Sequence, residues 1–177
     1  QLITGMGLDL DLSSIYEGRR ASRAGIPFSR MMLTTQDVPS GEQRKMMEEM
    51  MLEGMKYNVC SIHQLELVAD FASAHQLPLC LRLHPGVGAG ESVTRNTGDK
   101  YSCFGIHLTD LERALEFAAV KSIWFDQVHV HIGSGGDPQL WRDNIDRELG
   151  YVQQYFPSVH TVNLGGGFKE ARMPDEK

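Results

Sequence analysis

Short apolar segments alternate with longer amphipathic segments along the whole chain. Six segments have the length and composition of strands, at residues 7–12, 30–34, 57–61, 79–83, 127–132 and 160–164. Helical patterns separate most of them, at residues 13–24, 42–53, 62–74, 109–121 and 138–155. Alternation of this kind indicates parallel strands joined by right-handed crossovers. The pattern therefore predicts an α/β fold.

Several predicted helices have recognisable ends. Candidate N-caps precede three of them, at Ser13, Ser61 and Thr109. Two helices are followed by a glycine, Gly25 or Gly54, which helix C-termini favour. We expect the helices to begin and end at these residues.

Two architectures fit this alternation, a β/α barrel and an open doubly wound sheet. A complete eight-stranded barrel takes about 250 residues. Six units in 177 residues therefore predict a partial TIM (β/α)8 barrel that lacks the first and last strands. The first residue is Gln1, and both ends read as cut, so we expect residues 1–177 to be the central part of one barrel domain. The doubly wound sheet, complete at six strands, is the structural rival.

Composition excludes several classes of protein. The net charge of -6 argues against a nucleic-acid surface, which would show clustered lysine and arginine. Neither a membrane-spanning apolar run nor a signal peptide is visible, and we expect a cytoplasmic protein. The three cysteines are scattered without a C-x-x-C pair, so the sequence predicts neither a disulfide framework nor a zinc site.

Residues whose side chains could bind a ligand or take part in catalysis lie where the predicted strands end. In both α/β architectures ligands bind at the carboxyl ends of the strands. Four predicted strands end in polar or glycine-rich sequence, at Asp9 and Asp11, at Arg82 and His84, at His129 and His131 before Gly133–Gly136, and at Asn163 before Gly165–Gly167. We expect these residues to form one site.

The two histidines of Q-V-H-V-H-I-G-S-G-G lie on one face of a predicted strand, because side chains alternate along it. Three interpretations remain open. The pair could bind a metal, as in a metal-dependent barrel hydrolase, with His84 as a further ligand. Each histidine could instead be a satisfied core residue. Finally, His131 could present a flat ring to an aromatic cofactor.

Glycine-rich loops follow the last two predicted strands. Glycines let backbone N–H groups approach an anion, and a serine hydroxyl adds a donor. G-S-G-G at 133–136 and G-G-G at 165–167 therefore suggest two walls of one phosphate cradle, whereas a metal site would need neither. Neither loop contains the G-x-G-x-x-G motif of dinucleotide-binding folds, which argues against a doubly wound sheet that binds NAD.

Four motifs together resemble a known family: L-R-L-H-P-G-V from residue 81, S-x-F-G-I from residue 102, H-V-H-I-G-S-G from residue 129 and L-G-G-G-F from residue 164. They are similar to motifs of the alanine-racemase-fold (group IV) pyridoxal-phosphate decarboxylases, which include diaminopimelate, ornithine and arginine decarboxylases. The resemblance covers nearly the whole chain. It implies a β/α barrel that binds pyridoxal 5'-phosphate, and a homodimer in the full-length protein.

The resemblance also implies site residues. His131 is expected to stack on the pyridine ring, and Ser134 to hold the phosphate together with the backbone of Gly165, Gly166 and Gly167. Gly133 and Gly135 shape the loop. The candidate catalytic residues are Asp11 and Glu17, near the cofactor lysine, and Arg82, which supports the site. An exposed cap for Asp11 and a solvated helix face for Glu17 are the plainer alternatives.

Departures from the family pattern are as informative as the matches. The Schiff-base lysine belongs to a Y-A-x-K-A-N-type motif that this chain does not contain, and the E-P-G-R-type acid would follow Lys177. The C-terminal β domain of the family is absent as well. Cys103 stands where lysine or arginine is usual, Asn163 where aspartate is usual, and Asp9 where glycine is common. The stretch T-T-Q-D at 34–37 replaces an asparagine-lysine pair. We therefore expect the isolated chain to be inactive.

The resemblance implies decarboxylation of a basic or diamino acid through an external aldimine. Diaminopimelate is the favoured substrate, because R-L-H-P-G-V-G-A-G and H-I-G-S match that branch. The sequence G-S-G-G-D-P is more similar to the corresponding motif of ornithine decarboxylases, so an ornithine or arginine decarboxylase is the alternative. A non-catalytic pyridoxal-phosphate-binding or regulatory protein of the same fold also remains open.

Overall fold

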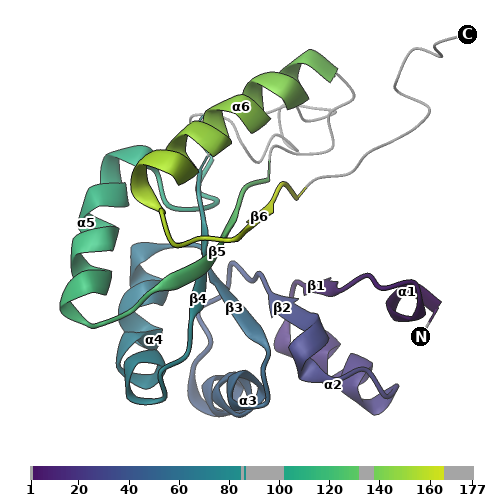
Figure 1. The fold of residues 1–177 in the computed structure, drawn as a ribbon. Coiled ribbons are helices and arrows are strands. Elements are labelled where there is room, and N and C mark those ends of the chain that lie inside the picture. Colours follow the sequence, from purple (N-terminus) through teal and green to yellow (C-terminus); the bar gives the residue numbers. More distant parts are fainter. Residues whose placement is uncertain (1, 85, 87–101, 132–137, 166–177) are drawn as a thin grey trace, which may run out of the picture. The chain divides into compact units, whose positions relative to one another are not determined.

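The computed structural model describes residues 2–84, 86, 102–131 and 138–165 (Figure 1). Its strands are β1 (Leu10–Leu12), β2 (Met31–Leu33), β3 (Lys56–Val59), β4 (Leu79–Arg82), β5 (Phe125–His129) and β6 (Thr161–Asn163). Its helices are α1 (Leu2–Gly5), α2 (Ile15–Arg23), α3 (Gly41–Leu52), α4 (Ile62–Ala74), α5 (Leu108–Val120) and α6 (Pro138–Tyr155), with a 3-10 turn η1 (Phe28–Arg30). Each predicted strand and helix is present. Only α1 and η1 were not predicted.

The order of the strands decides between the two predicted architectures. Along the sheet the order is β1-β2-β3-β4-β5-β6, the same as in the chain. A doubly wound sheet reverses its order at a switch point, whereas a barrel adds each strand beside the previous one. The partial β/α barrel is therefore confirmed, and the doubly wound rival is wrong.

The chain divides into two compact units. The first comprises Gln1–Cys80 and Ala114–Trp124, and the second comprises Leu81–Arg113 and Phe125–Lys177. In the first unit β1, β2 and β3 pair in parallel, with Leu12 opposite Leu33 and Leu33 opposite Tyr57. Gly18 lets α2 lie close to this sheet, because a Cβ there would come within 3.2 Å of Leu12 Cδ1. The first unit thus has its own core.

The helix ends of the first unit mostly follow the predicted signals. The Ser61 hydroxyl caps α4 by accepting a hydrogen bond from the Gln64 N–H at 3.1 Å. Gly25 and Gly54 follow α2 and α3 with φ of +85° and +99°, as expected for glycines that end helices. The N-cap of α2 is Ser14 and not Ser13 as predicted.

In the second unit the predicted cap Thr109 is wrong, because α5 already begins at Leu108. The parallel pair β5–β6 sets His129 opposite Asn163. Beyond the strand the Val130 N–H still donates to the Asn163 carbonyl at 2.9 Å, so the pairing continues toward the histidines. The strand β5 itself starts two residues before the predicted one. None of the described helices has the length and apolar character that crossing a bilayer requires.

Tyr57 is fully buried in the first unit with no hydrogen-bond partner for its hydroxyl among the described residues. Burial, and then the nearby Cys60, raise the pKa of Tyr57, so the phenol stays neutral. A buried hydroxyl without a partner costs free energy. We expect Tyr57→Phe to leave the free energy of unfolding unchanged or to raise it by up to about 1 kcal/mol, as measured by urea unfolding.

The exposed Tyr16, whose hydroxyl accepts a hydrogen bond from Gln43 at 3.3 Å, offers a matched control. Tyr16→Phe should change the stability by less than about 0.5 kcal/mol. A loss of 1 kcal/mol or more in Tyr57→Phe would mean that the hydroxyl has a partner in solution.

Candidate functional site

The polar strand ends of the second unit meet at one edge of its sheet. Arg82 is the last residue of β4, His129 of β5 and Asn163 of β6, and His131 follows two residues after β5. The Leu83 N–H donates to the His129 carbonyl at 2.8 Å. The structure therefore brings Arg82, His129 and the end of β6 together, as the sequence predicted.

Gly165 occupies a position at this edge that excludes any side chain. Its φ is +56°, in the left-handed region. A Cβ there would lie 2.5 Å from the Val130 carbonyl oxygen, 2.8 Å from His129 Nε2 and 2.8 Å from His131 Nδ1. Both imidazoles thus face the turn at Gly165, which confirms that they share one face. The Gly165 N–H donates to Asn163 Oδ1 at 2.9 Å, so Gly165 shapes the turn and its own N–H is engaged there.

Both histidines at this edge are neutral at physiological pH. Burial, together with the charges of Arg82 and His131, lowers the pKa of His129 to about 3. Burial, and then Arg82, also lower the pKa of His131, which is half-buried. The two ring centroids are 6.3 Å apart, with the planes inclined by 44°. His129 is only 2% exposed, whereas His131 still has an accessible ring. Of the two, His131 can contact a ligand.

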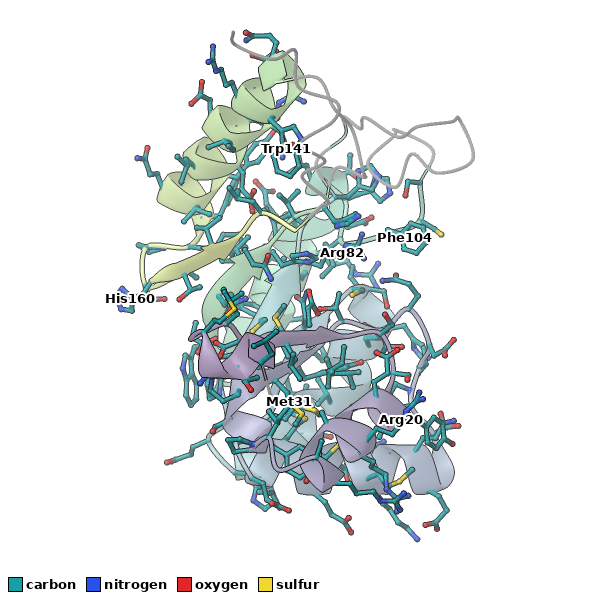
Figure 2. All side chains as sticks on the ribbon, turned by 90° about the vertical axis from the view of Figure 1, so that its right-hand side faces the viewer. Arg20, Met31, Arg82, Phe104, Trp141 and His160 are labelled. Atoms are coloured by element: carbon teal, nitrogen blue, oxygen red, sulfur yellow. The ribbon has the colours of Figure 1, made fainter. Side chains whose placement is uncertain are left out.

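Arg82 is held in place by the segment 104–106. It is 6% exposed, and its guanidinium lies 5.2 Å from the centre of the Phe104 ring (Figure 2). The Ile106 N–H donates to the Arg82 carbonyl at 2.8 Å. Gly105 makes this approach possible, since a Cβ there would be 2.9 Å from the Leu83 carbonyl. Phe104 is a supporting residue that the sequence reasoning missed, although its S-x-F-G-I motif was recognised.

His84 does not join the other histidines. Its ring stacks on His107 with centroids 3.9 Å apart and planes at 12°. Its Nδ1 accepts a hydrogen bond from the Gly86 N–H at 3.1 Å, so this nitrogen carries no proton. Among the described residues no group of three or more histidine, cysteine, aspartate or glutamate side chains could hold a metal ion. The metal interpretation therefore finds no further ligand within those ranges.

The remaining predicted residues lie in the first unit or outside the described ranges. Asp11 is in the middle of β1 and exposed. Glu17 is half-buried on α2, and its Oε2 accepts a hydrogen bond from the Ser13 N–H at 2.7 Å, so it stabilises the start of that helix. Five predicted residues lie outside the described ranges: Gly133, Ser134, Gly135, Gly166 and Gly167.

The described part of the site suits a flat, anionic ligand. A neutral imidazole offers a ring face without repelling a cationic heteroaromatic ring. The guanidinium of Arg82 supplies a permanent positive charge beside it. The turn at Gly165 brings backbone close to both imidazoles. These residues fit a phosphorylated aromatic cofactor such as pyridoxal 5'-phosphate.

Comparison with known proteins gives a family match and named relatives. The family model described as "Pyridoxal-dependent decarboxylase, pyridoxal binding domain" matches residues 1–177. Diaminopimelate decarboxylase of Escherichia coli K12 is 28% identical over 94% of the chain and 39% of its own length. The Bacillus subtilis protein of the same name is 31% identical over 95% of the chain and 40% of its own length. The chain thus spans about two-fifths of these relatives.

Solved structures show the same fold. A crystal structure of diaminopimelate decarboxylase has a TM-score of 0.83 and 26% identity, and the match covers 99% of this chain and 41% of that one. Arginine decarboxylase of Paramecium bursaria Chlorella virus, solved with bound agmatine, has a TM-score of 0.68 and 17% identity, over 92% of this chain and 42% of that one. The second likeness concerns the fold alone.

Proposed function

Because the chain belongs to the family of pyridoxal-dependent decarboxylases, whose pyridoxal-binding domain matches it from end to end, we propose that it is the central part of the cofactor-binding barrel of an amino-acid decarboxylase. The favoured substrate is diaminopimelate, because the named relatives reported above are diaminopimelate decarboxylases. The observation that carries the proposal is the cluster of Arg82, His131 and Gly165 at one sheet edge. Its chemistry suits the family's cofactor. The full-length protein is proposed to be a cytoplasmic homodimer.

Pyridoxal phosphate, when bound, supplies the electron sink that loss of an α-carboxylate requires. The residues of this chain bind the cofactor and orient it. His131 presents a neutral ring for stacking on the cofactor, and His129 beneath it stays buried and uncharged. Arg82, fixed by Phe104 and the Ile106 N–H, holds a positive charge beside that ring. We expect this charge to orient anionic groups of cofactor or substrate.

The phosphate is proposed to lie between the two glycine-rich loops. Ser134 and the N–H groups of Gly166 and Gly167 are the expected donors, and Gly133, Gly135 and Gly165 shape the loops. The Gly165 N–H is not needed for this role, since it already donates to Asn163.

For Asp11 and Glu17 the support is resemblance alone. They are proposed to stand near the cofactor lysine, and Glu17 has in addition the capping role described above. None of the six lysines of the chain stands in a Y-A-x-K-A-N motif. We therefore propose that the 177-residue chain has no turnover by itself.

Replacing His131 by alanine is expected to weaken binding of pyridoxal phosphate about two- to tenfold, because an aromatic stack contributes about 0.5–1.5 kcal/mol. Equilibrium dialysis of the cofactor against the chain, or against its full-length parent, measures this without relying on turnover. His131→Phe should keep most of the affinity, since it retains a flat ring.

The matched control is the exposed His160, whose N–H donates to the Asp126 carbonyl at 3.4 Å near the start of β5, whereas the imidazole pair lies at and beyond the end of that strand. His160→Ala should bind the cofactor like the unchanged chain (Figure 2 labels this residue). Equal affinity of His131→Ala and the unchanged chain, or a His131→Phe variant as weak as His131→Ala, would contradict ring stacking.

A further inference from the structure

Helix α6 buries two polar side chains one turn apart. Asn144 and Glu148 are 1% and 2% exposed, and they share the inner helix face with the apolar Trp141. Four atoms, Asn144 Nδ2 and Oδ1 and Glu148 Oε1 and Oε2, have no hydrogen-bond partner among the described residues. Buried polar groups are nearly always bonded, and leaving one unbonded costs about 1–3 kcal/mol. Two such side chains together point to a partner that binds there.

These atoms line a small cavity within the second unit. Its walls are Leu83, Val130, Asn144, Arg147, Glu148 and Tyr151. The cavity has room for a group of about the size of one water molecule. Val130 alternates with His129 and His131 along the chain, so its side chain points away from the imidazole face. The cavity is therefore separate from the site described above.

Apart from Glu148, the ionisable residues that line the cavity are Arg147 and Tyr151, both on α6. The other two wall residues, Leu83 and Val130, are apolar and directly follow β4 and β5. Arg147 is exposed and Tyr151 half-buried. Burial alone raises the pKa of Glu148 to about 8, so no cation among the described residues compensates its charge. The carboxylate form of Glu148 thus needs a positive group inside the cavity.

The chemistry of the walls selects that group. The Glu148 carboxylate and the Asn144 amide offer three acceptor oxygens, which match the three N–H donors of a primary ammonium with its single positive charge, whereas Asn144 Nδ2 is itself a donor and takes no part in binding it. Calcium and magnesium ions take six or more oxygen ligands, zinc takes four ligands, and the described residues provide no group of three histidine, cysteine, aspartate or glutamate side chains that could hold a metal ion. Water carries no charge. We propose that Asn144 and Glu148 form a binding site for a primary ammonium group, either the free ammonium ion or the end of an alkylamine.

Protons and ammonium groups compete at this site, because the ammonium requires ionised Glu148. Since the carboxyl group titrates near pH 8, the affinity for an alkylammonium should rise about tenfold between pH 7 and pH 9. A primary alkylamine, with a pKa of about 10.4, stays charged over this range. A ligand that binds the protonated, neutral form of Glu148 would show the opposite trend, because its affinity would fall as the pH rises.

Thermal denaturation of the full 177-residue chain tests the site. Methylammonium chloride should raise the midpoint at pH 9, and about tenfold more of it should be needed at pH 7. Tetramethylammonium chloride, with the same charge but no N–H donor, should have no such effect. An ammonium chloride series at pH 8 separates the sources: a response as large as that to methylammonium indicates the free ion, and a smaller one an alkylamine.

Glu148→Gln keeps the shape of the side chain and removes its charge, so it should abolish the response to methylammonium. Glu112→Gln, on the exposed face of α5, should respond like the unchanged chain. If Glu148→Gln does not fold, the tenfold difference between pH 7 and pH 9 in the methylammonium concentration that stabilises the unchanged chain still tests the proposal. Equal stabilisation by tetramethylammonium, a full response in Glu148→Gln, or no response at pH 9 would each overturn the proposal. None of these readouts depends on cofactor or turnover.

Discussion

Gly165→Ala is expected to lower the free energy of unfolding by about 2–4 kcal/mol, because two costs combine. A left-handed φ of +56° costs a residue with a Cβ about 1–2 kcal/mol. The added methyl group would also meet the Val130 carbonyl oxygen at 2.5 Å and both imidazoles at 2.8 Å. Backbone and two packed rings must shift, so cofactor binding should weaken as well. Urea unfolding followed by circular dichroism measures the stability change.

Gly150 provides the matched control for this substitution. It lies in the interior of α6, and a Cβ there would meet nothing within 4 Å. Gly150→Ala should therefore stabilise the protein by about 0.5–1 kcal/mol, the usual gain in a helix interior. Two glycine-to-alanine changes in one unit would then act in opposite directions. A Gly165→Ala variant as stable as the unchanged chain would show that the turn at Gly165 is not formed as described.

Glu148→Met is expected to stabilise the protein, and the gain should grow by about 1.4 kcal/mol per pH unit between pH 5 and pH 8. The pKa of Glu148 is about 8 in the folded chain against an ordinary value of 4.5. In this window the unfolded state has lost the proton that the folded state retains, so the stability of the unchanged chain falls as the pH rises. Methionine removes the titrating group and fills a similar volume.

The measurement is urea unfolding at pH 5, 6.5 and 8 in a buffer free of amines, so that no ammonium ligand interferes. Glu112→Met on the exposed face of α5 serves as the control and should show the pH dependence of the unchanged chain. A constant difference between Glu148→Met and the unchanged chain over the whole pH range would exclude a buried carboxyl group with a raised pKa.

The two histidines of the chain's H-x-H stretch illustrate how much of the site was predictable. Alternation along a strand was enough to place both rings on one face, and the turn at Gly165 confirms it. Their difference was not predictable from the pattern. His129 is buried among β4, β5 and β6, whereas His131 lies just past the strand and remains accessible. That distinction depends on neighbours far away in the sequence.

Glu17 and Glu148 illustrate the opposite limits of sequence reasoning. The sequence suggested a site role for Glu17, and the structure shows a half-buried side chain whose carboxylate caps α2. Glu148 attracted no attention, because a glutamate in an amphipathic helix is normally on the solvent face. Its burial follows from how α6 packs on the second unit, with Trp141 and Asn144 on the same face.

The sequence by itself determined the alternation of strands and helices, the helix ends at Ser61, Gly25 and Gly54, and the family motifs. These features are local, since periodicity, caps and turns depend on residues a few positions apart. Only the tertiary structure decided the strand order, the clash-free turn at Gly165 and the burial of Glu148. Strand order, close approach and pKa depend on which distant segments become neighbours, and that information is not contained in any single stretch of the chain.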